Sequence, residues 1–160
     1  MTKKKVYIVR HGETDACGKE DVKEKDIWMN EKGRLQIEKV LSKLPRTIDK
    51  ILTSPTLRTM ETAQKIQEYS LFAPIETEIR LHNKAENDDV FEKNIQSLLS
   101  DLRDDPEQEI VLVTHGRIVK MIFAILSTGK LDRAIMDMID LSYGGITILQ
   151  YGWFCTLLDG

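Results

Sequence analysis

Two of the three histidines in this chain occupy matching positions in the sequence. His11 closely follows the apolar run 6–9, and His115 closely follows the apolar run 110–113. Each run is typical of a strand buried on both faces, and each histidine is followed by a glycine. Ligands collect beyond the carboxyl ends of parallel strands. If the two strands are parallel neighbours, both imidazoles face one crevice, where an imidazole can act as a nucleophile or carry a proton.

Arg58 supplies a cation for the same region. Residues 48–52 predict a further strand, and the segment 53–55 (Thr-Ser-Pro) predicts a helix cap with proline near the first turn. Arg58 then falls in that first turn, near the positive end of the helix. A guanidinium group beside unbonded helix amides suits a phosphate group.

Other side chains with chemical potential are predicted to be structural. A single histidine after a strand is usually structural, so the hypothesis for His11 depends on its combination with His115 and Arg58. His82 stands in a polar loop and is predicted to be exposed rather than a ligand. Solvated helix positions are predicted for Arg34 and Arg117, and packing rather than substrate stacking is predicted for Trp28 and Trp153.

The elements that position these residues alternate between strands and helices. Asn30 is predicted to cap a helix that stops before Pro45, and one of the aspartates at 88–89 is predicted to cap a helix that follows the one containing Arg58. A further helix over 118–126 is predicted to close at Gly129. Further predictions are a charged loop over 15–30 that rims the site, a short strand near residue 79, a short helix or irregular segment over 131–140, and strands over 146–150 and 154–158.

Composition excludes several classes of protein. A chain of 160 residues, 41% hydrophobic and 31% charged, predicts one globular domain over 1–160. The net charge of −3 gives no general attraction to nucleic acid or to an anionic membrane, so we expect neither as a partner. No stretch has transmembrane length, and none resembles a signal peptide. Cys17 and Cys155 lack zinc-type spacing and fit a reducing cytoplasm, although a bridge between them stays open.

Four segments, in order, resemble a known family. Residues 10–14 (Arg-His-Gly-Glu-Thr) resemble the signature of the histidine phosphatase superfamily, which includes the phosphoglycerate mutase-like enzymes. Residues 29–36 resemble its Leu-Thr-x-x-Gly-x-x-Gln helix start, and residues 54–63 resemble its Ser-x-x-x-Arg-x-x-x-Thr-Ala segment. Residues 114–116 (Thr-His-Gly) resemble its second His-Gly. Four ordered matches across most of the chain are far more specific than one.

The resemblance implies an α/β fold of the phosphoglycerate mutase type, a three-layer α/β/α sandwich with a mostly parallel central sheet. It also implies a metal-independent phosphatase that works through a phosphohistidine intermediate on His11, without a cofactor. One ring nitrogen would attack phosphorus while the other donates to a backbone carbonyl that fixes the tautomer. The residues expected to bind phosphate are Arg10, Gly12, Arg58, His115 and Gly116.

Two positions depart from the family pattern. Many members carry asparagine six residues after the catalytic histidine, where this chain has Cys17, so one hydrogen bond to phosphate is missing or supplied elsewhere. Mutase-like members place glutamate just after an Arg-Leu-x turn, where this chain has Asn83, and an amide cannot deliver a proton. Glu86, the nearest carboxylate in that loop, is the candidate proton donor, and a solvated loop glutamate is the alternative interpretation.

These departures, together with the short chain, favour the small bacterial phosphohistidine phosphatases over the glycolytic mutases. Phosphohistidine has a good leaving group, and an open site suits a phosphate carried by a protein. The alternative substrate is a small phosphate ester, hydrolysed by a phosphomonoesterase or mutase-like enzyme. The alternative function is a catalytically weak phosphate-binding module that lacks the general acid.

Overall fold

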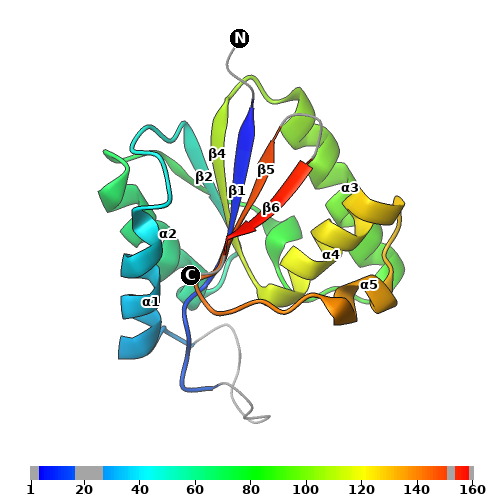
Figure 1. The fold of residues 1–160 in the computed structure, drawn as a ribbon, viewed down its shortest axis with the longest axis horizontal. Helices are drawn as coiled ribbons and strands as arrows, with labels where there is room; N and C mark the ends of the chain where they lie inside the picture. The colour runs from blue at the N-terminus through cyan, green and yellow to red at the C-terminus, as the bar shows by residue number, and fades with distance from the viewer. Residues whose placement is uncertain (1–3, 17–26, 151–153, 159–160) are drawn as a thin grey trace.

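A computed structural model describes residues 4–16, 27–150 and 154–158 of the chain. The strands are β1 (Lys5–Arg10), β2 (Lys50–Thr53), β3 (Ile75–Thr77), β4 (Glu109–Thr114), β5 (Ile146–Gln150) and β6 (Phe154–Leu158). The helices are α1 (Glu31–Leu41), α2 (Leu57–Tyr69), α3 (Asp88–Asp104), α4 (Gly116–Thr128) and α5 (Arg133–Met138), with a 3₁₀ helix, η2 (Ile79–Leu81), before α3. Figure 1 shows α1 and α2 on one side of the sheet and α3, α4 and α5 on the other. This is the predicted three-layer sandwich.

The sheet is mostly parallel, as predicted. Its strand order is β3-β2-β4-β1-β5-β6. β4 pairs in parallel with β1 and β2, and β2 pairs in parallel with β3. β5 pairs antiparallel with both β1 and β6. In the register of β1 and β4, Arg10 lies opposite Thr114, so His11 and His115 leave the sheet side by side at the same edge.

Hydrophobic side chains fill the space on both faces of the sheet. Val6 and Ile8 of β1 belong to the cluster packed against α3 and α4, whereas Tyr7 and Val9 belong to the cluster packed against α1 and α2. The alternation arises because successive side chains of a strand point to opposite faces. A strand that is apolar on both faces needs helices on both, which is why the run 6–9 predicted a central position.

Helix starts follow the predicted capping residues only in part. Asn30 caps α1 as predicted, because its side-chain oxygen accepts a hydrogen bond from an amide of the first turn at 2.8 Å. Thr56 caps α2, so the predicted cap at 53–55 is slightly too early. Asn87 caps α3, and the two aspartates at 88–89 stand instead in the first helical turn. The positive end of the helix dipole stabilises carboxylates in this turn.

Other sequence predictions have mixed outcomes. The strands over 146–150 and 154–158 and the end of α4 at Gly129 are confirmed. The strand near residue 79 is wrong, because β3 ends at Thr77 and η2 follows. Trp28 is 53% exposed, so its predicted packing is also wrong. Most of the charged loop over 15–30, together with Cys17 and Trp153, lies outside the described residues.

A pair of glycines allows the loop after β1 to lie directly on α1. A Cβ atom on Gly33 would stand 2.2 Å from the carbonyl oxygen of Glu13, and a Cβ atom on Gly12 would stand 2.3 Å from the carbonyl oxygen of Gly33. No side chain fits at such distances. Gly12 therefore has a role in packing, which the sequence did not predict. The contact holds the backbone that immediately follows His11.

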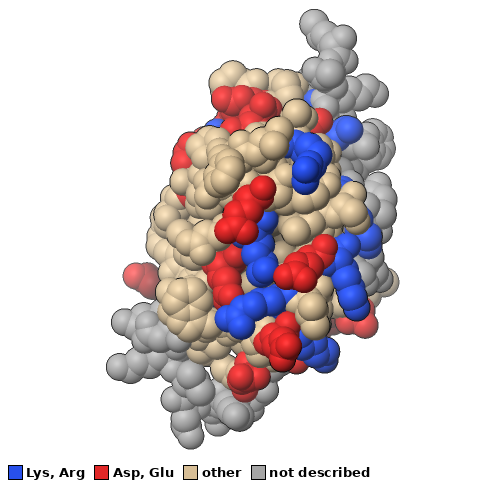
Figure 2. Space-filling view, turned by 90° about the vertical axis from the view of Figure 1, so that its left-hand side faces the viewer, with Lys and Arg blue, Asp and Glu red and all other residues tan. Residues whose placement is uncertain are grey.

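The surface formed by α1 and α2 carries charges of both signs. Figure 2 shows lysine and arginine interspersed with aspartate and glutamate on this side of the molecule. Arg34 is exposed, as predicted, and its Nε lies 2.5 Å from Oε1 of Glu61, while Lys65 Nζ lies 3.0 Å from Oε1 of Glu38. Exposed pairs of this kind contribute little stability.

Within the described part of the chain, no helix is both long enough and apolar enough to cross a membrane.

Candidate active site

His11 lies just beyond β1, and only 7% of its surface is exposed. Its Nδ1 is 2.7 Å from the carbonyl oxygen of Gly12, and because a carbonyl can only accept, Nδ1 carries the proton. Its Nε2 is 3.2 Å from Nε of Arg58, which can only donate. The two contacts leave Nε2 as the unprotonated ring nitrogen. This is the tautomer that a nucleophilic imidazole needs.

Arg58 connects His11 to the second histidine. It is the second residue of α2 and is buried. Its Nη2 lies 3.3 Å from Nδ1 of His115, and Nε2 of His115 lies 2.8 Å from the hydroxyl oxygen of Ser54. Since the guanidinium only donates, Nδ1 of His115 accepts and Nε2 donates its proton to Ser54. The ring centroids of His11 and His115 are 5.3 Å apart, with the planes at 69°.

Arg10 reaches the same place from the end of β1. Its Nη1 donates to the carbonyl oxygen of Leu141 at 2.5 Å, and its guanidinium carbon lies 3.8 Å from the ring centroid of Tyr143, a cation–π contact. The Tyr143 ring is also 5.8 Å from that of His11. Among the described residues, Nε of Arg10 is buried without a hydrogen-bond partner. Gly116 leaves room beside it, since a Cβ there would stand 3.0 Å from this nitrogen. A buried donor without a partner favours a ligand with acceptor oxygens.

The electrostatics of the site favour an anion. The pKa of His11 is lowered from 6.5 to about 3, chiefly by burial and also by Arg58 and Arg10, although the hydrogen bond to Gly12 opposes them. Burial likewise lowers the pKa of His115 to about 2. Both imidazoles are therefore neutral near pH 7, while the two guanidinium groups are charged. Two poorly solvated positive charges strongly favour a phosphoryl group.

These pKa shifts predict acid sensitivity of the fold. In the unfolded chain a histidine takes up a proton near pH 6.5, whereas in the fold His11 and His115 stay neutral down to about 3 and 2. Below about pH 6.5 the unfolded state binds more protons, so we expect the free energy of unfolding to fall as the pH drops toward about 3. Urea denaturation at a series of pH values measures this loss. The double variant His11→Asn/His115→Asn should show a shallower dependence, and equal dependence in both proteins would contradict the prediction.

The loop after η2 brings one unexpected residue to the site. His82 is half-buried, and its ring centroid lies 6.2 Å from that of His115, with the planes at 67°. The prediction that His82 is simply an exposed loop residue is therefore wrong. Glu86, the candidate proton donor, is exposed, and among the described residues it has no recorded hydrogen bond or ion pair with His11 or His115.

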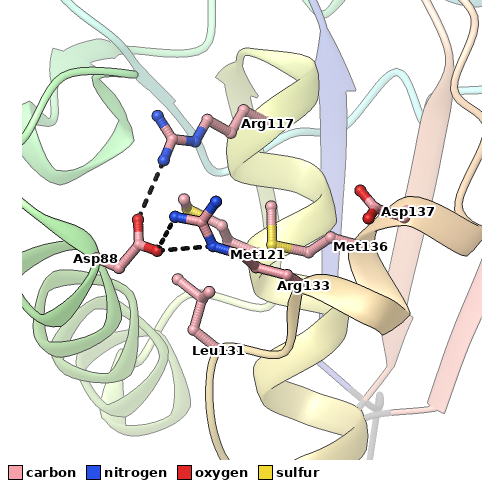
Figure 3. A pocket seen from close by; sticks show the side chains of 7 residues that line it. All are labelled: Asp88, Arg117, Met121, Leu131, Arg133, Met136 and Asp137. Carbon is pink, nitrogen blue, oxygen red and sulfur yellow. Dashed lines mark hydrogen bonds and ion pairs between the residues drawn. The ribbon is translucent and has the colours of Figure 1, made fainter.

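A pocket of about 210 Å³ lies between α3, α4 and α5. Figure 3 shows the carboxylate of Asp88 held by Arg117 of α4 and Arg133 of α5. Arg117 Nη2 is 3.2 Å from Oδ1, and Arg133 Nε is 3.0 Å from Oδ2. Arg117 is on the surface, as predicted. The pairing commits the carboxylate of Asp88 to two cations. Among the described residues, no group of three or more His, Cys, Asp or Glu side chains is placed to hold a metal ion.

Comparison with known families agrees with this geometry. A model of the histidine phosphatase superfamily (branch 1) matches residues 6–88, which is more than half of the chain. The chain belongs to the histidine phosphatase superfamily. The matched segment includes most of β1 together with His11 and Arg58, and membership identifies the protein as a phosphatase. No curated protein sequence matches the chain significantly.

Solved structures of other proteins share the fold of this histidine phosphatase. An Escherichia coli protein assigned as an α-ribazole-5′-phosphate phosphatase has a TM-score of 0.78 at 16% identity, covering 98% of this chain and 95% of its own. The phosphoserine phosphatase of Entamoeba histolytica has a TM-score of 0.76 at 21% identity, with coverage of 98% and 95%. An Agrobacterium tumefaciens protein assigned as the phosphohistidine phosphatase SixA has a TM-score of 0.72 at 18% identity, covering 98% of each chain. The TM-scores show that the fold is shared, and at these low identities the substrate stays open.

The structure brings most of the predicted phosphatase residues together. The side chains that meet are those of Arg10, His11, Arg58 and His115. Sequence reasoning missed Ser54, although it stands at the start of the recognised segment 54–63. It also missed Tyr143, for which no motif gave a signal, because the residue reaches Arg10 only through the antiparallel return of the chain to β1. His82 stands beside Asn83, and its proximity to His115 is visible only in three dimensions.

Proposed function

We propose that this histidine phosphatase hydrolyses phosphate carried on a protein through a phosphohistidine formed at Nε2 of His11. The observation that carries the proposal is the tautomer of His11, whose unprotonated Nε2 lies against the guanidinium of Arg58. A phosphoryl group placed there meets a nucleophile and a cation together. The runner-up substrate is a small phosphate ester.

The contacts of the site suggest a role for each group in the displacement. As Nε2 of His11 attacks phosphorus, Nε of Arg58 would exchange its contact with His11 for a phosphoryl oxygen. The buried Nε of Arg10 would donate to a second oxygen. His115 would hold Arg58 in this position, because its Nδ1 accepts a hydrogen bond from Nη2 of the guanidinium. Water would then attack the phosphohistidine and release phosphate, restoring His11.

The leaving group narrows the class of substrate. The charged groups that lower the pKa values of His11 and His115 are arginines and histidines. Among the described residues, no carboxylate is among the charges that shift these two pKa values. Where no carboxylic acid assists the leaving group, a serine alkoxide leaves poorly, whereas the imidazole of phosphohistidine leaves readily. We therefore favour a protein-borne phosphoramidate as the physiological substrate.

Rapid-quench experiments with radiolabelled substrates test this proposal. We expect a phosphoenzyme that is labile to acid and stable to alkali, as a phosphoramidate is, and a higher kcat/KM for a phosphohistidine protein than for a phosphoserine protein or a small ester. An acid-stable phosphoenzyme would place the phosphate on serine or threonine. Vanadate binding without any phosphoenzyme or turnover of an aryl phosphate would support the catalytically weak phosphate-binding module instead.

A further inference from the structure

His82 has a defined place beside the active site because the chain before it is anchored to β4. Thr114, the residue before His115, donates its hydroxyl group to the carbonyl oxygen of Leu81 at 2.7 Å, and Leu81 is fully buried. The amide of His82 donates to the carbonyl oxygen of Ile79 across η2. His82 therefore directly follows Leu81, which is hydrogen-bonded to the last residue of β4, immediately before His115.

The imidazole of His82 is oriented by a hydrogen bond of its own. Its Nδ1 lies 3.1 Å from the amide nitrogen of Lys84, and because an amide only donates, Nδ1 is the acceptor. The proton of the neutral ring is then on Nε2. The ring meets that of His115 in an edge-on arrangement, at 6.2 Å between centroids. Burial is the largest cause that lowers the pKa of His115, and the proximity of His82 lowers it further.

The carboxyl groups of the same loop are less well placed to assist a leaving group. Asp88 is bound between Arg117 and Arg133 (Figure 3). Glu86 is exposed. The position at which mutase-like enzymes carry their acid is an amide, Asn83. In this loop, the ring of His82 lies against that of His115, with 6.2 Å between the centroids.

We propose that His82 contacts the departing group of the substrate and donates its Nε2 hydrogen in a hydrogen bond to the departing atom, in place of a carboxylic acid. This inference rests on the proposed displacement at His11. There the Nε2–P bond forms, the P–O or P–N bond of the substrate breaks, and the electron pair of that bond stays on the departing atom. His82 keeps its proton, since a neutral imidazole is too weak an acid to release it, and a departing anion takes its proton from water afterwards.

A hydrogen bond without proton transfer selects a class of substrates. It stabilises the charge on a phenolate, or the lone pair on the nitrogen of a departing imidazole. It does not replace the full proton that an alkoxide from phosphoserine requires. The site would then act on phosphorylated groups that leave readily, and protein phosphohistidine is one of them.

A series of aryl phosphates, whose phenols differ in pKa, tests the role of His82 near neutral pH. His82→Phe retains a ring without a donor, and His82→Gln retains an amide donor. For His82→Phe we expect kcat/KM for phenyl phosphate to fall roughly 10- to 100-fold and to fall much less for p-nitrophenyl phosphate. The dependence of kcat/KM on phenol pKa therefore steepens, and His82→Gln should recover part of the change. Lys84→Ala is the control, since it retains the amide bonded to Nδ1, and its dependence should match the wild type.

If the dependence of kcat/KM on phenol pKa were unchanged in both His82 variants, the proposal would be overturned, even if all rates fell together. A merely structural role would lower kcat/KM by the same factor for every substrate. A steeper dependence in Glu86→Gln, with none in the His82 variants, would assign the donor to Glu86 instead. Phosphoenzyme formation from p-nitrophenyl phosphate by the His82 variants shows that they are folded with a working nucleophile. Failure of the proposed function is distinct, because the wild-type protein would then form no phosphoenzyme.

Discussion

His11→Ala is expected to lower kcat for p-nitrophenyl phosphate by a factor on the order of 10⁴ or more, because loss of the nucleophile removes the covalent route entirely. His115 is held by contacts at both of its ring nitrogens. Its Nε2 is bonded to Ser54, and its Nδ1 faces the guanidinium of Arg58. Steady-state turnover together with rapid-quench detection of the phosphoenzyme measures the effect.

The matched control for this experiment is His11→Asn, which keeps a polar side chain in the same space. We expect both variants to retain vanadate binding, since Arg10, Arg58 and His115 remain, so that lost turnover reflects lost chemistry. Vanadate binding is measured by calorimetry. Turnover near the wild-type level in His11→Ala would show that another residue carries the phosphate.

Arg58→Ala is expected to lower kcat/KM by roughly 10²–10³-fold, the range found when one charged or hydrogen-bonding group is removed from a transition state. Arg58→Lys should recover little of this loss. A lysine presents a single ammonium group, whereas the guanidinium reaches His11 through Nε and His115 through Nη2, at 3.2 and 3.3 Å. Steady-state kinetics with p-nitrophenyl phosphate, together with vanadate affinity, measure both variants.

Arg34→Ala provides a control with the same change in net charge. Arg34 lies on the exposed side of α1, where it pairs with Glu61, so its loss should leave kcat/KM close to the wild-type value. If Arg58→Lys were as active as the wild type, the site would need only a positive charge there. The two-point contact of the guanidinium would then have no catalytic importance.

The fold and the main residues of the site could be predicted from the sequence for a common reason. The runs at 6–9 and 110–113 are apolar on both faces, which demands central strands, and a histidine after each strand must then emerge at the shared edge. The contacts around these residues were harder to predict from the sequence. The ring of Tyr143 on Arg10 and the ring of His82 beside His115 depend on how two loops return to the sheet. Loop paths have no periodicity from which such a contact can be predicted.

Local errors have local causes. The residues 53–55 include good capping types, but β2 continues through Thr53 and the chain needs three further residues before α2 begins at Leu57. Thr56 is thereby the residue in the capping position. At α3, Asn87 competes with the two aspartates beside it, and all three side chains are good N-caps. Sequence alone gives no ground for choosing among them.

The contact between Gly12 and Gly33 makes a surface helix part of the catalytic apparatus. The carbonyl oxygen of Gly12 accepts a hydrogen bond from Nδ1 of His11, and the same glycine lies against the backbone of Gly33 in α1. A methyl group at Gly33 has to displace the loop at Glu13, and with it the acceptor that selects the reactive tautomer. In a saturation mutational scan scored for activity, Gly33 would rank with the substrate-binding positions, although none of its own atoms need touch phosphate.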